Sequence, residues 1–150
     1  MRALSTTLAL LGAVVLFAVG CGPDPNRPVS NADFLSCVRS NLRTSTFGND
    51  IDQLAADQTC AAPLSDPAPF QAEMAACGAP TADSQLMDLR SDLSTFGQQW
   101  GELRTLVRGY CQSRDPNQGV AVNKQEDAML ATLNKMQAIL DAHPENSSVP

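Results

Sequence analysis

The stretch LMDLRSDLSTFGQQWGELRTLVRGY, residues 86–110, carries the longest periodic pattern in the chain. Its large apolar side chains are separated alternately by three and four residues: Leu86, Leu89, Leu93, Phe96, Trp100, Leu103, Val107 and Tyr110. This spacing lines up the apolar side chains along one side of an α-helix, where a second helix can pack. The pattern predicts a long helix from about Ala82 to Ser113, with Thr81 as its N-cap and Trp100 in the core.

A second segment near the C-terminus repeats the same spacing. Its apolar positions are Met129, Leu133, Met136 and Leu140. The residues Asn123–Glu126 resemble a capping box, so we expect this helix to run from about 123 to 142. The residues Asp115–Asn117, with Gly119, predict a turn between the two helices. Helices joined by a short loop are expected to pack antiparallel.

Shorter helices are predicted ahead of the long one, over residues 31–43, 50–62 and 67–77. In the first, the apolar side chains share one face: Phe34, Leu35, Val38 and Leu42. Ser65–Pro67 supplies a start and Gly78 a stop for the third. No stretch alternates with a period of two for long enough to be a strand. The sequence therefore predicts an all-α domain over residues 31–142, a bundle of about five helices built on the long one, followed by a loose tail over 143–150.

Two glycines lie beside the apolar stripe of the long helix, at positions 97 and 101. Each costs about 1 kcal/mol relative to Ala inside a helix. Because the stripe is unbroken, Gly97 and Gly101 favour a close approach of another helix over a flexible joint. Tolerated small residues are the alternative.

The first 21 residues have the pattern of a bacterial export signal. Arg2 precedes an apolar run from Leu8 to Val19, which is shorter than the roughly 20 residues that a membrane-spanning helix needs. The residues Ala18–Cys21 resemble the processing box of bacterial lipoproteins. That resemblance implies cleavage before Cys21 and acylation of Cys21 by a diacylglycerol and an N-acyl group. An ordinary cleaved signal or an uncleaved anchor are the alternatives.

The resemblance also implies a location in the cell envelope. Gly22, rather than Asp, follows the cysteine, as in lipoproteins released to the outer membrane of bacteria that have two membranes. In a bacterium with one membrane, the same anchor would leave the protein on the outer face of the plasma membrane. Three prolines between Gly22 and Ser30 predict a flexible tether over residues 21–30.

The mature chain is acidic. Removal of Arg2 leaves nine basic against 16 acidic residues. An acidic chain without a basic run argues against nucleic acid as a partner and against electrostatic adhesion to anionic lipid.

Four cysteines remain in the mature domain, at positions 37, 60, 77 and 111. Their spacing lacks the paired Cys-x-x-Cys units of a zinc site, and an exported protein with an even count is expected to form two disulfides. A helix from Leu86 to Cys111 spans about 37 Å, whereas the residues from Cys77 to Leu86 reach about 31 Å when fully extended. Since a disulfide needs Cα atoms within about 7 Å, Cys77–Cys111 survives only with an almost fully straight linker, and setting it aside also sets aside its complement, Cys37–Cys60.

Two disulfide patterns remain. We favour the interleaved set, Cys37–Cys77 with Cys60–Cys111, because short antiparallel helices should bring Cys37 level with Cys77. The nested set, Cys37–Cys111 with Cys60–Cys77, is the first alternative, and sequential pairing or free thiols in a small core are the others.

The sequence offers little for catalysis. His143 is the sole histidine and lies beside Pro144 at a helix end, which is a poor place for a general base. Neither a nucleophile elbow nor a phosphate-binding glycine loop is present. We therefore predict no enzymatic activity, no cofactor and no metal, haem included.

One local group of basic side chains remains as a candidate site. Arg104 and Arg108 are four residues apart on the long helix, and Arg114 follows. The group could dock an acidic partner, or it could be an ordinary solvated face. The predicted function is that of a lipid-anchored, envelope-exposed protein that binds or scaffolds an unknown envelope or extracellular protein. The alternative is an inhibitor or immunity-type protein that blocks a secreted enzyme.

Overall fold

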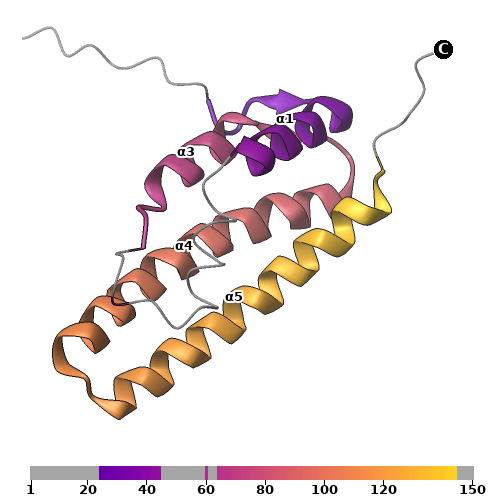
Figure 1. Cartoon of the computed structure of the whole chain (residues 1–150). Helices are drawn as coiled ribbons and strands as arrows, with labels where there is room; N and C mark the ends of the chain where they lie inside the picture. The colour runs from indigo at the N-terminus through magenta and orange to yellow at the C-terminus, as the bar shows by residue number, and fades with distance from the viewer. Residues whose placement is uncertain (1–23, 45–59, 61–63, 145–150) are drawn as a thin grey trace, which may run out of the picture.

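The computed structural model describes residues 24–44, 60 and 64–144. In chain order its elements are β1 (Pro28–Val29), α1 (Asn31–Thr44), α3 (Ala68–Ala76), β2 (Ala79–Pro80), α4 (Ser84–Ser113) and α5 (Pro116–Ala142). This part of the chain is mostly helical, with four helices (Figure 1). The signal peptide, Cys21, the tail beyond Pro144 and the helix expected over 50–62, apart from Cys60, lie outside the described residues.

The long helix predicted from the apolar pattern is α4. Seven of the eight patterned side chains are buried, and the eighth, Tyr110, is partly buried against them. The helix begins at Ser84, and its N-cap is Asp83 rather than Thr81. The Asp83 carboxylate accepts hydrogen bonds from the backbone N–H groups of Gln85 at 2.9 Å and Leu86 at 3.2 Å. The Thr81 hydroxyl instead bonds the carbonyl of Val29.

The C-terminal helix α5 runs back along α4 (Figure 1). It begins at Pro116, seven residues before the predicted start at Asn123. The Asp-Pro pair that indicated a turn is itself a helix start, because the Asp115 side chain accepts a hydrogen bond from the Asn117 N–H and proline suits the first helical position. Gly119 lies inside the helix, where a Cβ atom would come within 3.3 Å of the Tyr110 ring.

Helices α1 and α3 cover the other side of α4 (Figure 1). Phe34 and Val38 of α1 and Phe70 and Met74 of α3 are buried in the same core as the α4 stripe. The Phe70 ring lies 5.8 Å from Phe96 and 6.1 Å from Trp100, centroid to centroid, in the edge-on and tilted geometries that aromatic pairs prefer.

Close approach explains one of the two glycines that lie beside the apolar stripe of α4. A Cβ atom at Gly97 would lie 2.6 Å from Cγ of Gln71 on α3, so α3 packs where only a glycine fits without rearrangement. At Gly101 the nearest atom, Cγ of Pro67, would be at an ordinary 3.7 Å. The expected close crossing is therefore present at Gly97 and not required at Gly101.

The all-α prediction missed one small element. Strands β1 and β2 form a parallel pair, with Pro28 opposite Ala79 and Val29 opposite Pro80. Two residues are too few to show the alternation by which a strand is recognised in a sequence. The pair places residues 24–30, expected to be part of a flexible tether, on the surface of the domain.

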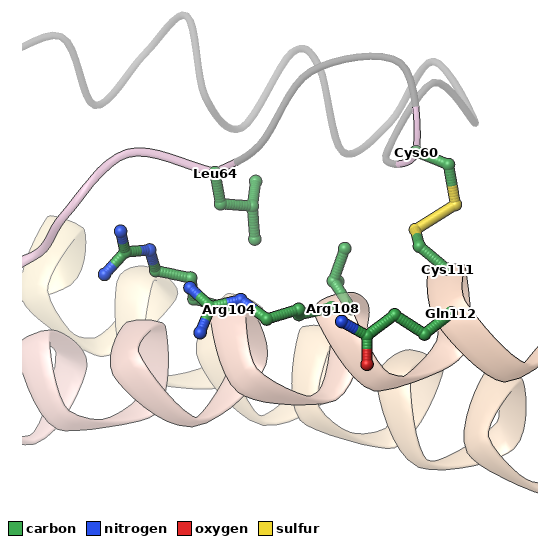
Figure 2. Close-up of a pocket in the computed structure, with 7 residues that line it drawn as sticks. Cys60, Leu64, Arg104, Arg108, Cys111 and Gln112 are labelled. Atoms are coloured by element: carbon green, nitrogen blue, oxygen red, sulfur yellow. A yellow bond between two sulfur atoms is a disulfide. The ribbon is translucent and has the colours of Figure 1, made fainter.

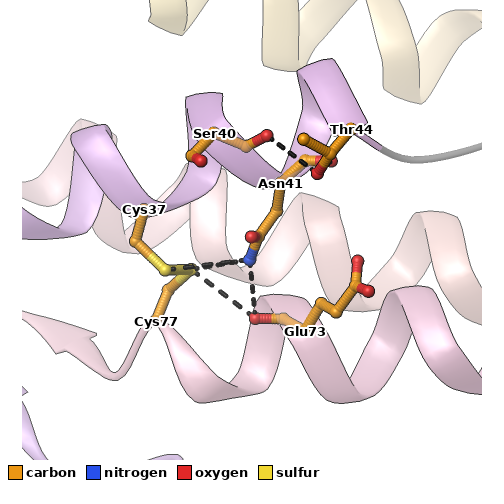
Figure 3. The surroundings of a disulfide bond; sticks show 6 residues. All are labelled: Cys37, Ser40, Asn41, Thr44, Glu73 and Cys77. Atoms are coloured by element: carbon orange, nitrogen blue, oxygen red, sulfur yellow. Dashed lines mark hydrogen bonds between the residues drawn. A yellow bond between two sulfur atoms is a disulfide. The ribbon is translucent and has the colours of Figure 1, made fainter.

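The interleaved disulfide pattern is confirmed. Cys37 is bonded to Cys77, and Cys60 to Cys111, with Cα atoms 5.5 Å apart in each pair. The first bond joins α1 to the end of α3 (Figure 3). Beside it, the Asn41 side-chain amide donates a hydrogen bond to the Glu73 carbonyl at 3.0 Å. The two disulfides indicate an oxidising, extracytoplasmic location.

The described helices include α4 and α5, which are both long enough to be compared with a membrane span. None of them combines the length and the apolar character that crossing a bilayer requires.

The buried aromatic cluster gives a direct test of the core. Trp100 is 4% exposed and contacts both Phe70 and Phe96. Truncation to Trp100→Ala should lower the free energy of unfolding by about 3–5 kcal/mol, as for large aromatic side chains in other cores. Denaturant unfolding measures this loss, with Leu130→Ala on the exposed face of α5 as the control. Equal midpoints for the two variants would show that the α4 stripe is not the core.

Candidate functional site

The clearest candidate for a binding site is a pocket of about 250 Å³ beside the C-terminal half of α4 (Figure 2). We call it the arginine pocket. It is lined by Cys60, Leu64, Arg104, Val107, Arg108, Cys111 and Gln112. Successive turns of α4 supply one wall, and the side chains of Cys60 and Leu64 supply the other. The Cys60–Cys111 disulfide closes one end and holds the two walls together.

The lining combines an apolar floor with polar groups at its edge. Leu64 and Val107 are buried, with 4% exposure each. The guanidinium groups of Arg104 and Arg108 and the amide of Gln112 supply the hydrogen-bond donors. Apolar surface bordered by a few convergent polar groups is typical of a site that binds a side chain or a small ligand.

Arg104 is only partly neutralised. Its Nη1 atom lies 3.7 Å from Oδ2 of Asp66, and the Arg104 side chain is 34% exposed. The Nε atom is buried and has no hydrogen-bond partner among the described residues. A buried donor without a partner costs free energy. The partly exposed guanidinium, with a 3.7 Å contact to Asp66, keeps further N–H donors for another acceptor.

Arg108 is the more accessible of the two. It is exposed, and within the described parts of the chain no hydrogen bond or ion pair engages its side chain. Like charges four residues apart repel each other on a helix, by a few tenths of a kcal/mol. A carboxylate bound between Arg104 and Arg108 would relieve that repulsion and could accept paired hydrogen bonds.

Arg114, predicted to belong to the same basic patch, does not line the pocket. It is the C-cap of α4, with a left-handed backbone at φ 55°, and its N–H bonds the Tyr110 carbonyl. Its guanidinium carbon lies 5.7 Å from the centroid of the Tyr110 ring. The structure therefore brings together Arg104 and Arg108 and assigns Arg114 to the helix end.

A second pair of arginines with the same spacing, not singled out in the sequence, is Arg39 and Arg43 on α1. Arg39 donates hydrogen bonds to the backbone carbonyls of Leu140, at 3.0 Å, and of His143. These carbonyls belong to the last turn of α5, whose carbonyl groups have no partner within the helix. Arg39 thus ties α1 to the end of α5.

His143 is engaged at the same end of the bundle. Its Nδ1 atom lies 2.9 Å from the Ile139 carbonyl oxygen, and its Nε2 atom lies 3.2 Å from Oδ2 of Asp83. The ring therefore links the end of α5 to the N-cap of α4. Among the described residues, no three His, Cys, Asp or Glu side chains are grouped closely enough to hold a metal ion.

The pKa of Asp83 is held below its ordinary value. The hydrogen bond from the Leu86 N–H is the largest cause, and His143 and the Gln85 N–H act in the same direction against partial burial. A carboxylate whose pKa is lower in the folded state stabilises the fold at pH values above its unfolded pKa of about 4. That stabilisation is lost as the pH falls through the folded value.

Comparisons with protein-family models, with curated proteins and with solved structures found no match for this chain. The functional argument therefore rests on the geometry described above.

The Asp83 cap predicts a defined pH dependence. In Asp83→Asn the amide oxygen can still cap α4, but the charge that His143 and the helix N-terminus favour is gone. The variant should melt below the wild type at pH 7, and the difference should shrink as the pH falls below about 4, where the wild-type carboxylate becomes protonated. Thermal melts from pH 7 to pH 2 measure this. A difference that stays constant across the range would contradict the role given to the Asp83 charge.

Proposed function

We propose that this protein is a lipid-anchored protein of the cell envelope that binds an acidic segment of another protein in the arginine pocket. The observation that carries the binding role is the pairing of Arg104 and Arg108 over an apolar floor, with Asp66 as the neighbouring carboxylate at 3.7 Å from Arg104. The protein performs no chemistry of its own in this proposal.

The anchoring role is supported by the N-terminal sequence. The residues Ala18–Cys21 resemble a lipoprotein processing box, and the two disulfides of the domain agree with export. Two or three acyl chains on Cys21 would hold the protein on a membrane durably, because a single chain binds only marginally. In a bacterium with two membranes, Gly22 directs the anchored protein to the outer membrane.

The covalent link at one end of the pocket supports a binding role. The Cys60–Cys111 disulfide closes a loop of 51 residues, which the chain-entropy model values at about 4 kcal/mol. It holds one pocket wall against α4, so a bound segment would not have to order that wall itself. Preorganisation of this kind raises affinity because less freedom is lost on binding.

Acylation is tested in the bacterium that makes the protein. Cells labelled with an alkyne fatty acid should incorporate the label into the wild type, and the protein should sediment with membranes. Cys21→Ser should lose the label and leave the membrane fraction, because its hydroxyl cannot form the thioether. A Cys21→Ser protein that is labelled and sedimented like the wild type would overturn the proposed anchor.

The arginine pocket is tested with a hexaglutamate peptide added to the isotopically labelled domain at low salt. The backbone amide signals of Leu64, Val107 and Gln112 should shift during the titration. Arg108→Gln should weaken binding about two- to fivefold, the change that corresponds to an exposed ion pair of about 0.5–1 kcal/mol.

The matched control for this titration is Lys124→Gln. It removes the same charge from an exposed position on α5 that does not line the pocket. Its affinity should stay near that of the wild type. Equal weakening by both variants would show general charge attraction and would contradict a site at the arginine pocket.

A further inference from the structure

The chain immediately after the proposed lipid anchor is built into the domain. The Arg27 N–H bonds the Asp24 carbonyl at 3.0 Å, and the Asn26 N–H bonds the Asp24 side chain at 2.9 Å, which together form a turn. Strand β1 follows directly and pairs with β2, and the Ala79 N–H adds a hydrogen bond of 2.9 Å to the Arg27 carbonyl. We call residues 24–29 the docked segment.

A side chain of α4 clamps the docked segment from the other side. The Arg90 Nη2 atom donates hydrogen bonds to the Pro25 carbonyl at 2.8 Å and to Oδ1 of Asn26 at 3.0 Å. These contacts join residues 64 and 65 positions apart in the chain. The docked segment is therefore held by α4 as well as by β2.

Gly78 is the position that permits this close approach. Its backbone has φ +81°, a conformation that favours glycine, and a Cβ atom there would lie 2.6 Å from the Arg27 carbonyl oxygen. The neighbouring Cys77 is fixed by its disulfide to Cys37. The surface that receives the docked segment is thus covalently braced.

This arrangement limits how far the domain can stand from a membrane. Three residue steps separate Cys21 from Asp24, and each step spans at most about 3.6 Å, so the two Cα atoms are within about 11 Å of each other. A free tether reaching to Asn31 would allow about three times that distance. The upper limit on the Cys21–Asp24 distance follows from chain length alone. It limits the distance between the domain and a membrane if Cys21 is acylated as proposed.

We infer that the acylated protein holds the surface formed by Pro25, Met87 and Arg90 against the lipid headgroups. This surface borders a shallow groove of about 560 Å³ between the docked segment, α3 and α4. Met87 is 50% exposed there, although it is a large apolar side chain. Because the link from Cys21 to the domain is short, we expect the partly apolar headgroup region of the bilayer to contact this groove.

The proposed contact between this surface and the lipid headgroups does not depend on anionic lipid. Two exposed carboxylates, Asp24 in the docked segment and Asp88 next to Met87 in the chain, balance the positive charges of Arg27 and Arg90, so the region has no excess positive charge to attract anionic lipid. The α4–α5 turn lies at the other end of α4: from Arg90 to Ser113 the helix rises about 35 Å. The arginine pocket, nearer that turn, therefore faces the envelope space where a partner can reach it.

Paramagnetic relaxation in lipid nanodiscs tests this orientation with the full acylated protein. The discs contain phosphatidylcholine with a small fraction of a gadolinium-chelating lipid, and mass spectrometry first establishes acylation. Relaxation of the Met87 and Ser91 amides should be enhanced several-fold more than that of Gly119 and Val120. The same profile is expected when anionic phosphatidylglycerol is added.

A released variant and a matched control test the docked segment itself. Gly78→Ala with Arg90→Gln removes the clamp and pushes on the Arg27 carbonyl, so the enhancement at Met87 should fall toward that at Gly119. Arg108→Gln, an equal charge change on the same helix, should keep the wild-type profile. If the released variant does not fold, the wild-type profile alone decides the orientation.

The outcomes separate the two proposals. Protein without acyl chains would overturn the proposed anchor. Acylated protein with equal enhancement at both ends of α4, or with the larger enhancement at Gly119, would overturn the orientation and leave the anchor standing. A profile that appears in anionic discs alone would also overturn it, because charge and not tether length would then be responsible.

Discussion

The apolar stripe of α4 is the constraint on which the rest of the structure depends. One continuous helix of 30 residues presents buried side chains from Leu86 to Val107, and each of the other helices described packs on it or on a helix that does. Helix α5 covers one side and α1 with α3 the other (Figure 1). Because short helices are only marginally stable alone, α1 and α3 owe their stability to this surface.

A second structural centre lies where α3 ends. Cys77 forms the disulfide to α1, and Gly78 has the backbone conformation that admits the docked segment. Ala79 and Pro80 form β2. This junction ties the N-terminal part of the domain together at one end of α4. The arginine pocket and its disulfide lie toward the other end. The proposed anchor and the proposed partner site are thus separated along a single rigid helix.

The features that could be predicted from the sequence depend on local patterns, whereas most of those that were missed depend on contacts between distant residues. The α4 stripe follows from helix periodicity, a property of one chain segment. Chain reach narrowed the disulfide patterns to two, and the choice between them depends on how α1 and α3 pack. The start of α5 at Pro116 was missed because an Asp-Pro pair is equally suited to a turn and to a helix cap. The β1–β2 pair and the contacts of Arg39 and Arg90 depend on residues at least 50 positions apart, and no local pattern reports such contacts. Of the three arginines grouped in the sequence, Arg104 and Arg108 line the pocket, whereas Arg114 is the C-cap of α4, because the helix ends before it.

Peptide mapping under non-reducing conditions tests the central claim most directly: that a straight α4 holds the remaining segments in this arrangement. Protease digestion of the native protein should yield one pair of peptides joined by Cys37 and Cys77 and another joined by Cys60 and Cys111. The thiol-alkylating reagent should label none of these four residues before reduction. A peptide pair joining Cys37 to Cys60, or Cys77 to Cys111, would contradict the account, because a straight helix keeps Cys111 beyond the reach of Cys77.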